Sequence, residues 1–430
     1  MKARRPDQTP SAVSPGAADG PETRVARPYH GRMAPSYHRL GRLPPKRHVA
    51  FRGPDGELYP EELVGSEGFG GRYSLLHHRY APTRVSEVRE TAPVPPSPRP
   101  ARHGALRHHL LRTRRQGPAP AGDEISGRRW LLYNDDLRIG VSDFGAGPGR
   151  LVRNGGADEL HFVHEGAGKL ESVFGVLDYR AGDYVLVPKG TTHRWAPDAE
   201  PNRHLVLEAR APVHLPERYQ NQEGQLLEHA PYWERDFRRP QELLSLDDPS
   251  PTDVLVRVDD RAAVYTLDHH PFDVVGWDGH LYPYAFSIHD FEPISGRQHQ
   301  PPPVHQTFEL DGAVLCSFCP RRLDDGPGVV TAPYNHANLD SDEVLYYVSG
   351  SFFSRRGIEP GALTFHPHGV PHGPAPGVAE GSIGRTHTDE LAVMIDAFRP
   401  LVLTSDSEAL DDPAYPTSWL PAAETTGLTS

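Results

Sequence analysis

Two segments of this chain repeat the same pattern of residues, and this repeat restricts the fold more than any other feature. Each copy begins with an asparagine, followed five positions later by a glutamate and seven positions after that by a glycine. Further along, each copy has a glycine followed six positions later by the pattern Pro-x-Gly-x-x-His. Agreement at several aligned points is typical of a duplicated fold, so we expect two similar β-barrels. The matched residues are Asn154, Glu159, Gly166, Gly182, Pro188, Gly190 and His193 in the first copy and Asn338, Glu343, Gly350, Gly361, Pro367, Gly369 and His372 in the second.

The two copies differ at one position that matters for metal binding. His336 precedes the asparagine of the second copy by two residues, whereas Val152 stands at the matching position of the first. The second copy therefore has a full set of candidate ligands, the imidazoles of His336 and His372 and the carboxylate of Glu343. Two histidines and one carboxylate leave coordination positions open, as in the Fe(II) enzymes that activate O2. Imidazole also binds Ni, Zn and Mn, so the ligands predict a metal site without naming the metal.

The carboxylate ligand has a rival in the neighbouring residue, Asp342. Adjacent residues of a strand point to opposite faces of the sheet, so one of the two carboxylates faces inward and the other faces away. The spacing from Glu343 to the next glycine is repeated in the first copy, where Glu159 stands at the matching position. The repeat therefore selects Glu343.

Short strand patterns closed by turn residues recur along most of the chain. The 46 prolines and 41 glycines among 430 residues favour short strands and many turns. Helical patterns are scarce, and the best candidates are residues 103–115 and 231–244. We therefore predict a mostly β protein that resembles a bicupin, with two jelly-roll β-barrels and a few short helices. The expected strands lie in residues 128–134, 137–144, 159–166, 183–190, 204–210, 261–268, 313–319, 343–350, 351–355, 362–367 and 390–396.

The repeat and the local composition divide the chain into three segments. Residues 1–32 are polar and rich in proline, alanine and glycine, and we expect a disordered N-terminal extension there. Residues 33–240 are expected to form the N-terminal cupin half, in which the metal site is degenerate. Residues 241–430 are expected to form the C-terminal cupin half, which carries the iron site.

Bulk composition argues against several classes of protein. The formal net charge is -12, which disfavours a surface that follows nucleic-acid phosphates. No apolar run reaches the roughly 18–20 residues that cross a bilayer, and no export signal is apparent. We therefore expect no nucleic-acid or membrane partner and a cytoplasmic location. Cys316 and Cys319 lie in a strand pattern and are expected to be buried thiols, with a redox or metal role as the alternative.

From about Asp273 onward, the chain resembles the homogentisate 1,2-dioxygenase family. The resemblance rests on the sequences FDVVGWDGHLYPY, HQPPPVH, APYNHANLDSDE and FHPHGVPHGP, and a looser match covers residues 37–80. It implies that the metal is Fe(2+) and that its ligands are His336, Glu343 and His372. It also implies that His299 is an active-site base or hydrogen-bond donor, with a structural turn histidine as the alternative, and that His366 lies near the substrate.

The same resemblance implies a reaction. The family opens the ring of a hydroquinone-type aromatic acid with O2, converting homogentisate to maleylacetoacetate in tyrosine and phenylalanine catabolism. A small aromatic acid and O2 would then be the partners of this chain. The resemblance also suggests a homo-oligomer, either a trimer or a hexamer.

Several residues depart from the family pattern, and most of them concern the substrate. Phe352 stands where better-studied members have a substrate-binding tyrosine, and Arg355 stands at a nearby family lysine. Asp278 replaces a family histidine, with His280 close by, and one extra residue separates the first histidine ligand from the glutamate. A ring-cleaving dioxygenase for another dihydroxy- or amino-hydroxy-aromatic acid is therefore an alternative. A non-catalytic metal-binding bicupin is an alternative of another class.

Overall fold

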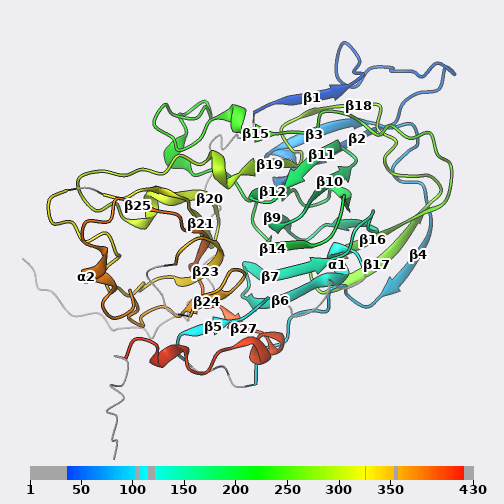
Figure 1. Cartoon of the computed structure of the whole chain (residues 1–430). Coiled ribbons are helices and arrows are strands. Elements are labelled where there is room, and N and C mark those ends of the chain that lie inside the picture. Colours follow the sequence, from blue (N-terminus) through cyan, green and yellow to red (C-terminus); the bar gives the residue numbers. More distant parts are fainter. Residues whose placement is uncertain are drawn as a thin grey trace, which may run out of the picture. The chain divides into compact units, whose positions relative to one another are not determined.

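The computed structural model describes residues 36–102, 104, 106–114, 122–324, 326–352 and 357–420. Strands dominate these residues (Figure 1), and the α-helices among them, α1 (Glu124–Gly127) and α2 (Val378–Ser382), are short. No helix within these ranges is long and apolar enough to span a membrane. The 3-10 turns are η1 (Glu67–Phe69), η2 (Glu217–Tyr219), η3 (Glu234–Asp236), η4 (Ile288–Asp290), η5 (Pro302–His305), η6 (Ser405–Leu410) and η7 (Tyr415–Thr417).

The first barrel is built from two large sheets. The order of the first sheet is β11 (Gly175–Arg180), β10 (Ala167–Ser172), β13 (Thr192–Pro197), β8 (Leu151–Asn154), β16 (Thr252–Val258), β17 (Arg261–Leu267) and β4 (Val85–Thr91). The order of the second sheet is β15 (Phe237–Arg238), β19 (Tyr284–Ser287), β12 (Asp183–Val187), β9 (Asp158–Glu165), β14 (Asn202–Ala209), β7 (Leu137–Phe144), β6 (Arg128–Tyr133) and β27 (Val402–Leu403).

Apolar side chains from both sheets meet inside the first barrel. Leu170 and Tyr179 come from β10 and β11, and Val163 and Val185 come from β9 and β12 of the other sheet. All four belong to one buried cluster. Two sheets whose inner faces share a core form a jelly-roll sandwich.

The second barrel is centred on one sheet of six antiparallel strands. Their order is β20 (Gln306–Leu310), β21 (Ala313–Phe318), β26 (Leu391–Ala397), β23 (Asp342–Ser349), β24 (Leu363–His366) and β5 (His109–Leu111). Shorter pairings complete the barrel, namely β22 (Arg321–Arg322) with β25 (His387–Thr388) and a single bridge between His336 and His372. Two jelly-roll barrels in one chain are the bicupin architecture that the repeat predicted, and this prediction is confirmed.

Strands from one part of the chain complete sheets of the other part. β5, from the first quarter of the chain, pairs with β24 of the second barrel. Conversely, strands from the later part of the chain join sheets of the first barrel. These are β16, β17, β19 and the C-terminal strand β27, which pairs with β6. β18 (Gly276–Gly279) joins a small sheet with β1 (His38–Gly41), β3 (Tyr73–His77) and β2 (Glu61–Gly65). The division between residues 240 and 241 stays a prediction. Each barrel contains strands from both sides of that division. Residues 1–32 lie outside the described residues.

Buried hydrogen bonds join the two barrels. The hydroxyl of Tyr184 in β12 lies 2.8 Å from Ser317 Oγ in β21. The hydroxyl of Tyr346 in β23 lies 2.8 Å from His164 Nδ1 and accepts a bond from Arg203 Nε at 3.1 Å. All of these groups except the ring of His164 are essentially excluded from solvent, so the polar contacts fix how the barrels pack.

The predicted strands are largely confirmed. Residues 137–144 form β7, and residues 343–350 contain all but the first residue of β23. In the segment 351–355, Ser351 and Phe352 belong to no strand, and the other three residues lie outside the described ranges. Cys316 and Cys319 are buried thiols, as predicted.

Both predicted helices are wrong. The described part of 103–115 contains β5, and 231–244 contains η3 and β15. Leu110 and Leu111 are neighbours in β5 and point to opposite faces of the sheet. Both are buried, because β5 pairs with β24 and other parts of the protein cover both of its faces. Tertiary burial of this kind overrides helix propensity, which is a weak preference.

Candidate metal centre

Three side chains, His336, Glu343 and His372, meet in the second barrel and are called the triad below. Glu343 is the second residue of β23, and the two histidines face each other across a short backbone bridge with N–H···O distances of 2.8 Å in both directions. One ligand-type atom from each side chain lies within 4.8 Å of the other two. His372 and Glu343 are buried, whereas the side chain of His336 is 30% exposed, so the group is reached from the His336 side.

Backbone carbonyls set the tautomers of both triad histidines. Nδ1 of His336 donates to the carbonyl of Tyr334 at 3.0 Å, and Nδ1 of His372 donates to the carbonyl of Val370 at 3.2 Å. A carbonyl accepts and cannot donate, so in the neutral ring the proton is on Nδ1 and Nε2 carries a lone pair. The Nε2 atoms lie 3.6 Å and 3.2 Å from oxygens of Glu343.

This arrangement fits a cation between the three side chains. Nε2 of His372 is buried and makes no hydrogen bond, although it lies 3.2 Å from Glu343 Oε1. A nitrogen lone pair directed at a carboxylate oxygen is repulsive unless a positive charge lies between them. A divalent ion with nitrogen and oxygen ligands meets this requirement.

Glu343 is held in its ionised form. Burial opposes ionisation, but the neighbouring imidazoles of His336, His366 and His372 outweigh burial and hold the pKa of the Glu343 carboxyl well below its usual range. The closest of these contacts runs from His366 Nδ1 to Glu343 Oε1 at 2.8 Å. The charged carboxylate is therefore available as a ligand across the physiological pH range.

A second acidic side chain, Asp396 of β26, lies opposite Glu343 in the sheet register. Burial, followed by the charge of Glu343, raises the pKa of Asp396 to about 7. The rival carboxylate Asp342 points elsewhere, because it accepts bonds from the backbone of His368 at 2.8 Å and of Leu401 at 2.6 Å.

His299 lies beside the segment that carries the first triad histidine. Its ring packs edge-on against Tyr334 at 4.8 Å, and its Nδ1 is 3.8 Å from Asp324 Oδ2. Both His299 and Tyr334 line a cavity of about 430 Å³, together with Asn335 and Pro374. Asn335 directly precedes His336, and Pro374 is two residues beyond His372 in sequence, so the cavity lies near the triad, although no triad side chain lines it.

The other predicted substrate residues are placed differently. His366 is fully buried, with Nδ1 at Glu343 and Nε2 3.1 Å from the hydroxyl of Tyr415, so its ring nitrogens face protein groups. Phe352 packs edge-on against Tyr347 at 4.8 Å within an apolar cluster. Arg355 lies outside the described residues.

Asp278, which replaces a family histidine, lies in the small sheet with β1. It accepts a hydrogen bond from the hydroxyl of Tyr37 at 2.9 Å and pairs with Arg47 at 3.3 Å. His280, just beyond β18, packs edge-on against the same Tyr37 at 5.7 Å. Asp278 and His280 therefore both contact residues of the small sheet and its surroundings.

The two copies of the repeat occupy equivalent places in their barrels. His193 pairs with Val152 in the first barrel, and His372 pairs with His336 in the second. Val152 therefore occupies the place of the first histidine of the triad. Both barrels also make the same backbone hydrogen bond, from Gly190 N to Asn154 O at 2.7 Å and from Gly369 N to Asn338 O at 2.6 Å.

Arginine side chains surround the glutamate of the first barrel. Arg128 Nη1 lies 3.1 Å from Glu159 and 2.8 Å from Glu208, and Arg128 Nη2 lies 2.7 Å from Glu124. Arg257 Nη1 lies 3.3 Å from Glu159 and 2.7 Å from Glu208. We call these five residues the arginine cluster. Burial favours the neutral forms, but the opposite charges hold the pKa of Arg128 well above its usual range and the pKa of Glu159 well below its own.

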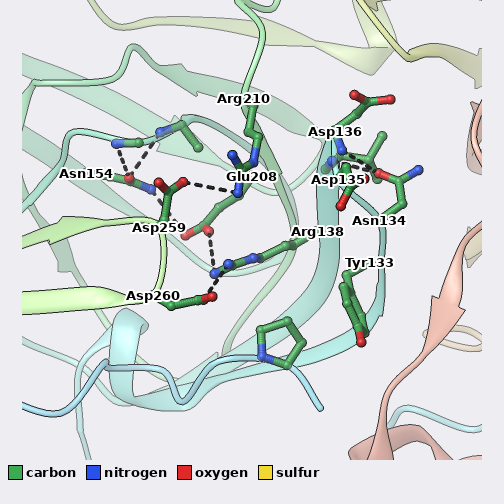
Figure 2. Close-up of a pocket in the computed structure, with 14 residues that line it drawn as sticks. Tyr133, Asn134, Asp135, Asp136, Arg138, Asn154, Glu208, Arg210, Asp259 and Asp260 are labelled. Atoms are coloured by element: carbon green, nitrogen blue, oxygen red, sulfur yellow. Dashed lines mark hydrogen bonds and ion pairs between the residues drawn. The ribbon is translucent and has the colours of Figure 1, made fainter. Parts of the chain in front are cut away.

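A cavity of about 160 Å³ adjoins this cluster at Glu208 and Asn154 (Figure 2). Its charged side chains include the pair Arg138 and Asp260 at 2.7 Å and the pair Arg210 and Asp259 at 3.3 Å. None of the predicted site residues lines it. This cavity is therefore separate from the candidate metal centre, which lies in the second barrel.

The residues that support the triad from distant parts of the chain were not predicted from the sequence. Tyr415 contacts His366, and Trp419 Nε1 donates to the carbonyl of Gly373 at 2.9 Å. The ring of His108 packs edge-on against His372 at 5.7 Å. No spacing rule links these positions to the repeat, and the three-dimensional packing alone brings them together.

Comparison with known proteins places the chain among dioxygenases. A family model described as "Homogentisate 1,2-dioxygenase N-terminal" matches residues 150–288. A protein of Saccharolobus solfataricus named "Putative dioxygenase SSO1533" is 39% identical over 386 residues, which cover 89% of this chain and 98% of that protein. The homogentisate 1,2-dioxygenase of Nitrobacter hamburgensis is 29% identical over 228 residues, and the match spans about half of each chain, 50% of this one and 49% of that one.

Among solved structures, a cupin 2 conserved barrel domain protein from Leptotrichia buccalis matches 70% of this chain and 99% of its own, with 7% identity and a TM-score of 0.32. The sequence match over nearly the whole chain shows that this protein belongs to the same dioxygenase family as the Saccharolobus protein, and residues 150–288 match the family model of the homogentisate 1,2-dioxygenases.

Proposed function

We propose that this protein is a non-haem Fe(II) dioxygenase that opens the ring of a hydroquinone-type aromatic acid, with homogentisate as substrate and maleylacetoacetate as product. The proposed Fe(2+) ligands are His336, Glu343 and His372. His299 is the proposed base, and Phe352, Arg355 and His366 are the proposed residues around the substrate. A trimeric or hexameric assembly and a cytoplasmic location stay predictions.

The observation that carries this proposal is the convergence of two imidazole lone pairs and one ionised carboxylate. The backbone contacts of both histidine rings orient Nε2 toward Glu343, which is how proteins commonly fix histidine ligands. Three protein ligands leave room for further ligands, and the two-histidine, one-carboxylate set is the one used by O2-activating iron enzymes. A purely structural zinc site would instead be closed by four ligands.

Held by the triad, Fe(2+) would supply the redox chemistry that activates O2 toward an aromatic ring. The protein's own contribution is to orient the ring and to move a proton. The cavity beside the triad is lined largely by apolar groups such as Val329, Val330 and Pro333, which suit an aromatic ring. His299 on the same cavity wall can take the proton of the ring hydroxyl and return it to the product.

The overall reaction balances without another redox partner. One ring carbon–carbon bond breaks, and both oxygen atoms of O2 enter the product. The electrons that reduce O2 come from the aromatic ring, which is oxidised as it opens. The proton held by His299 ends on the product, so the enzyme returns to its starting state.

A second substrate class is favoured by a specific observation. Phe352 stands where a tyrosine is expected, and its ring packs against Tyr347 and offers no hydroxyl to a substrate. In addition, the match to the named homogentisate dioxygenase covers half the chain, whereas the match to the Saccharolobus protein covers 89%. Another dihydroxy- or amino-hydroxy-aromatic acid is therefore the second candidate.

The test is O2 uptake by protein loaded anaerobically with Fe(2+). Homogentisate, gentisate and 3-hydroxyanthranilate are added in separate runs, and the ring-opened product is followed by its absorbance. Uptake with homogentisate supports the first candidate, and uptake with another ring acid alone supports the second. Bound iron without uptake on any ring acid would favour a non-catalytic metal-binding bicupin.

The proposed base has its own test. His299→Ala should retain iron and lose turnover by about 10²–10⁴-fold, the usual contribution of a general acid–base group. His229→Ala is the matched control, because His229 is exposed, belongs to the predicted N-terminal cupin half and does not line the cavity near the triad. Full activity of the His299 variant would contradict the assignment.

A further inference from the structure

A chain of hydrogen bonds leads from Glu343 to the C-terminal segment. Nδ1 of His366 lies 2.8 Å from Glu343 Oε1, and Nε2 of the same ring lies 3.1 Å from the hydroxyl of Tyr415. An ionised carboxylate only accepts, so Nδ1 of His366 carries a proton. In the neutral ring Nε2 is then an acceptor, and the hydroxyl of Tyr415 donates to it.

Packing holds Tyr415 in this position. Tyr415 is the first residue of η7 and is 3% exposed. Its ring lies nearly parallel to that of His366, with an angle of 11° and a centroid distance of 6.2 Å. Tyr415 also packs against Trp419 at 5.1 Å, and Trp419 is bonded to Gly373 next to the last triad ligand.

The C-terminal segment is itself anchored to the strand that closes the second barrel. Asp411 pairs with His109 Nδ1 at 2.9 Å, and Asp412 pairs with Arg112 at 2.8 Å. This segment, red in Figure 1, runs along β5 at the edge of the sheet that carries Glu343. These ion pairs therefore hold in place the segment that carries Tyr415.

The first barrel lacks a hydrogen-bond donor at the place that His366 occupies in the second barrel, although His161 lies 3.5 Å from Glu159 through Nε2 and 3.4 Å from His204 through Nδ1. The residue opposite Glu159 in the register of β9 and β12 is Val187, whereas the residue opposite Glu343 in β23 and β24 is His366. Valine cannot donate to a carboxylate. The histidine contact thus occurs in the barrel with the complete triad and is missing from the equivalent place in the barrel without it.

We propose that Tyr415 is a positioning residue for the metal centre, which acts by holding His366 in the tautomer that donates to Glu343. This inference rests on the proposed function, since it assigns a role toward the bound metal. With Tyr415 in place, the proton of His366 stays on Nδ1, and the carboxylate keeps one orientation toward the metal. Without the hydroxyl, the proton can move to Nε2, and a lone pair then faces the carboxylate.

Tyr415→Phe tests the proposal, with binding of Co(II) to the metal-free protein as the readout. The affinity is measured by competition with a chelator, and the coordination geometry is followed by the visible absorption spectrum of the bound Co(II). Loss of a group that supports a ligand usually weakens metal binding by about 10–100-fold, and we expect that loss and a changed spectrum.

Tyr346→Phe is the matched control. The hydroxyl of Tyr346 is equally buried and bonded to His164 and Arg203, but Tyr346 lies on the opposite face of β23 from Glu343. Both variants should lose similar thermal stability as metal-free proteins, and the control should bind Co(II) like the unchanged protein. Unchanged affinity and spectrum in Tyr415→Phe would overturn the proposal.

A double-mutant cycle provides the second measurement. In His366→Gln the side-chain amide can donate to Glu343 without help from Tyr415, so adding Tyr415→Phe should cost no further affinity. Additive losses would count against the proposal. If Tyr415→Phe does not fold, His366→Leu must weaken Co(II) binding for the proposal to stand. Failure of the unchanged protein to bind any metal would instead refute the proposed function itself.

Discussion

The two barrels of this chain solve the same electrostatic problem in different ways. Each barrel places two acidic side chains opposite each other across neighbouring strands, Glu159 with Glu208 in the first and Glu343 with Asp396 in the second. In the first barrel the side chain of Arg128 contacts both acids. In the second barrel histidines surround the carboxylate, and the geometry fits a metal ion. A duplicated barrel can therefore keep its buried acidic side chains when an arginine side chain supplies the positive charge in place of a metal ion.

Arginine is suited to this substitution because its guanidinium group stays charged and donates several hydrogen bonds in a plane. Arg128 uses both terminal nitrogens, toward Glu124 on one side and toward Glu159 and Glu208 on the other. Val152, at the place of the first triad histidine, offers no nitrogen that could bind a metal. The comparison predicts that only the second barrel depends on a metal.

The largest expected effect concerns the triad. His336→Ala should reduce metal affinity by about 10³-fold or more, since structural metal sites gain roughly 10–16 kcal/mol from three or four ligands together. The equivalent change in the first barrel, His193→Ala, should leave the metal content unchanged. Metal analysis of both purified variants checks the difference. Equal metal loss in the two variants would show that the barrels are not specialised as described.

Arg128→Met should give the next largest effect, on stability. It leaves Glu124, Glu159 and Glu208 buried without their main partner, and removal of one member of a buried ion pair costs about 3–5 kcal/mol. The free energy of unfolding, from denaturant titration of the metal-free protein, measures the loss. Arg84→Met is the control, because Arg84 and its partner Asp268 are both exposed, and such a surface pair contributes at most about 1 kcal/mol. Similar losses in both variants would argue against a special role for Arg128.

Glu159→Gln should have a smaller effect that depends on pH. The pKa of Glu159 in the folded protein lies well below the usual value of 4.5, so its ionised form stabilises the fold above that value. This stabilisation is lost as the pH falls through the depressed pKa. The variant should therefore be less stable than the unchanged protein near neutral pH, and the difference should shrink below about pH 4.5. A difference that stays constant into acid would contradict the assignment.

The repeat and the strand pattern predicted the architecture because both depend on local sequence. Residues 137–144 and 343–350 alternate or run apolar in the way that strands require, and the aligned glycines and prolines mark the turns between them. The same repeat selected Glu343 over Asp342, and the structure places the two side chains on opposite faces. These inferences needed no knowledge of distant contacts.

Other features could not be predicted, because distant residues create them. The apolar pattern around Leu110 fits a helix as well as a strand, and the available edge of β24 decides between them. The role of Arg128 depends on three acids from separate strands. Tyr415 lies more than forty residues beyond the last triad ligand, His372, and no motif connects them.

The crossing of strands between the halves has a consequence for any attempt to separate them. A fragment that begins after residue 240 would lack β5, and the backbone groups of β24 would be left as an open edge that can pair with other chains. His366 stands at the end of that strand, so the support of the metal carboxylate would lie next to the exposed edge. The barrel with the complete triad thus cannot be isolated by cutting the chain in the middle, and the duplication has become a single cooperative unit.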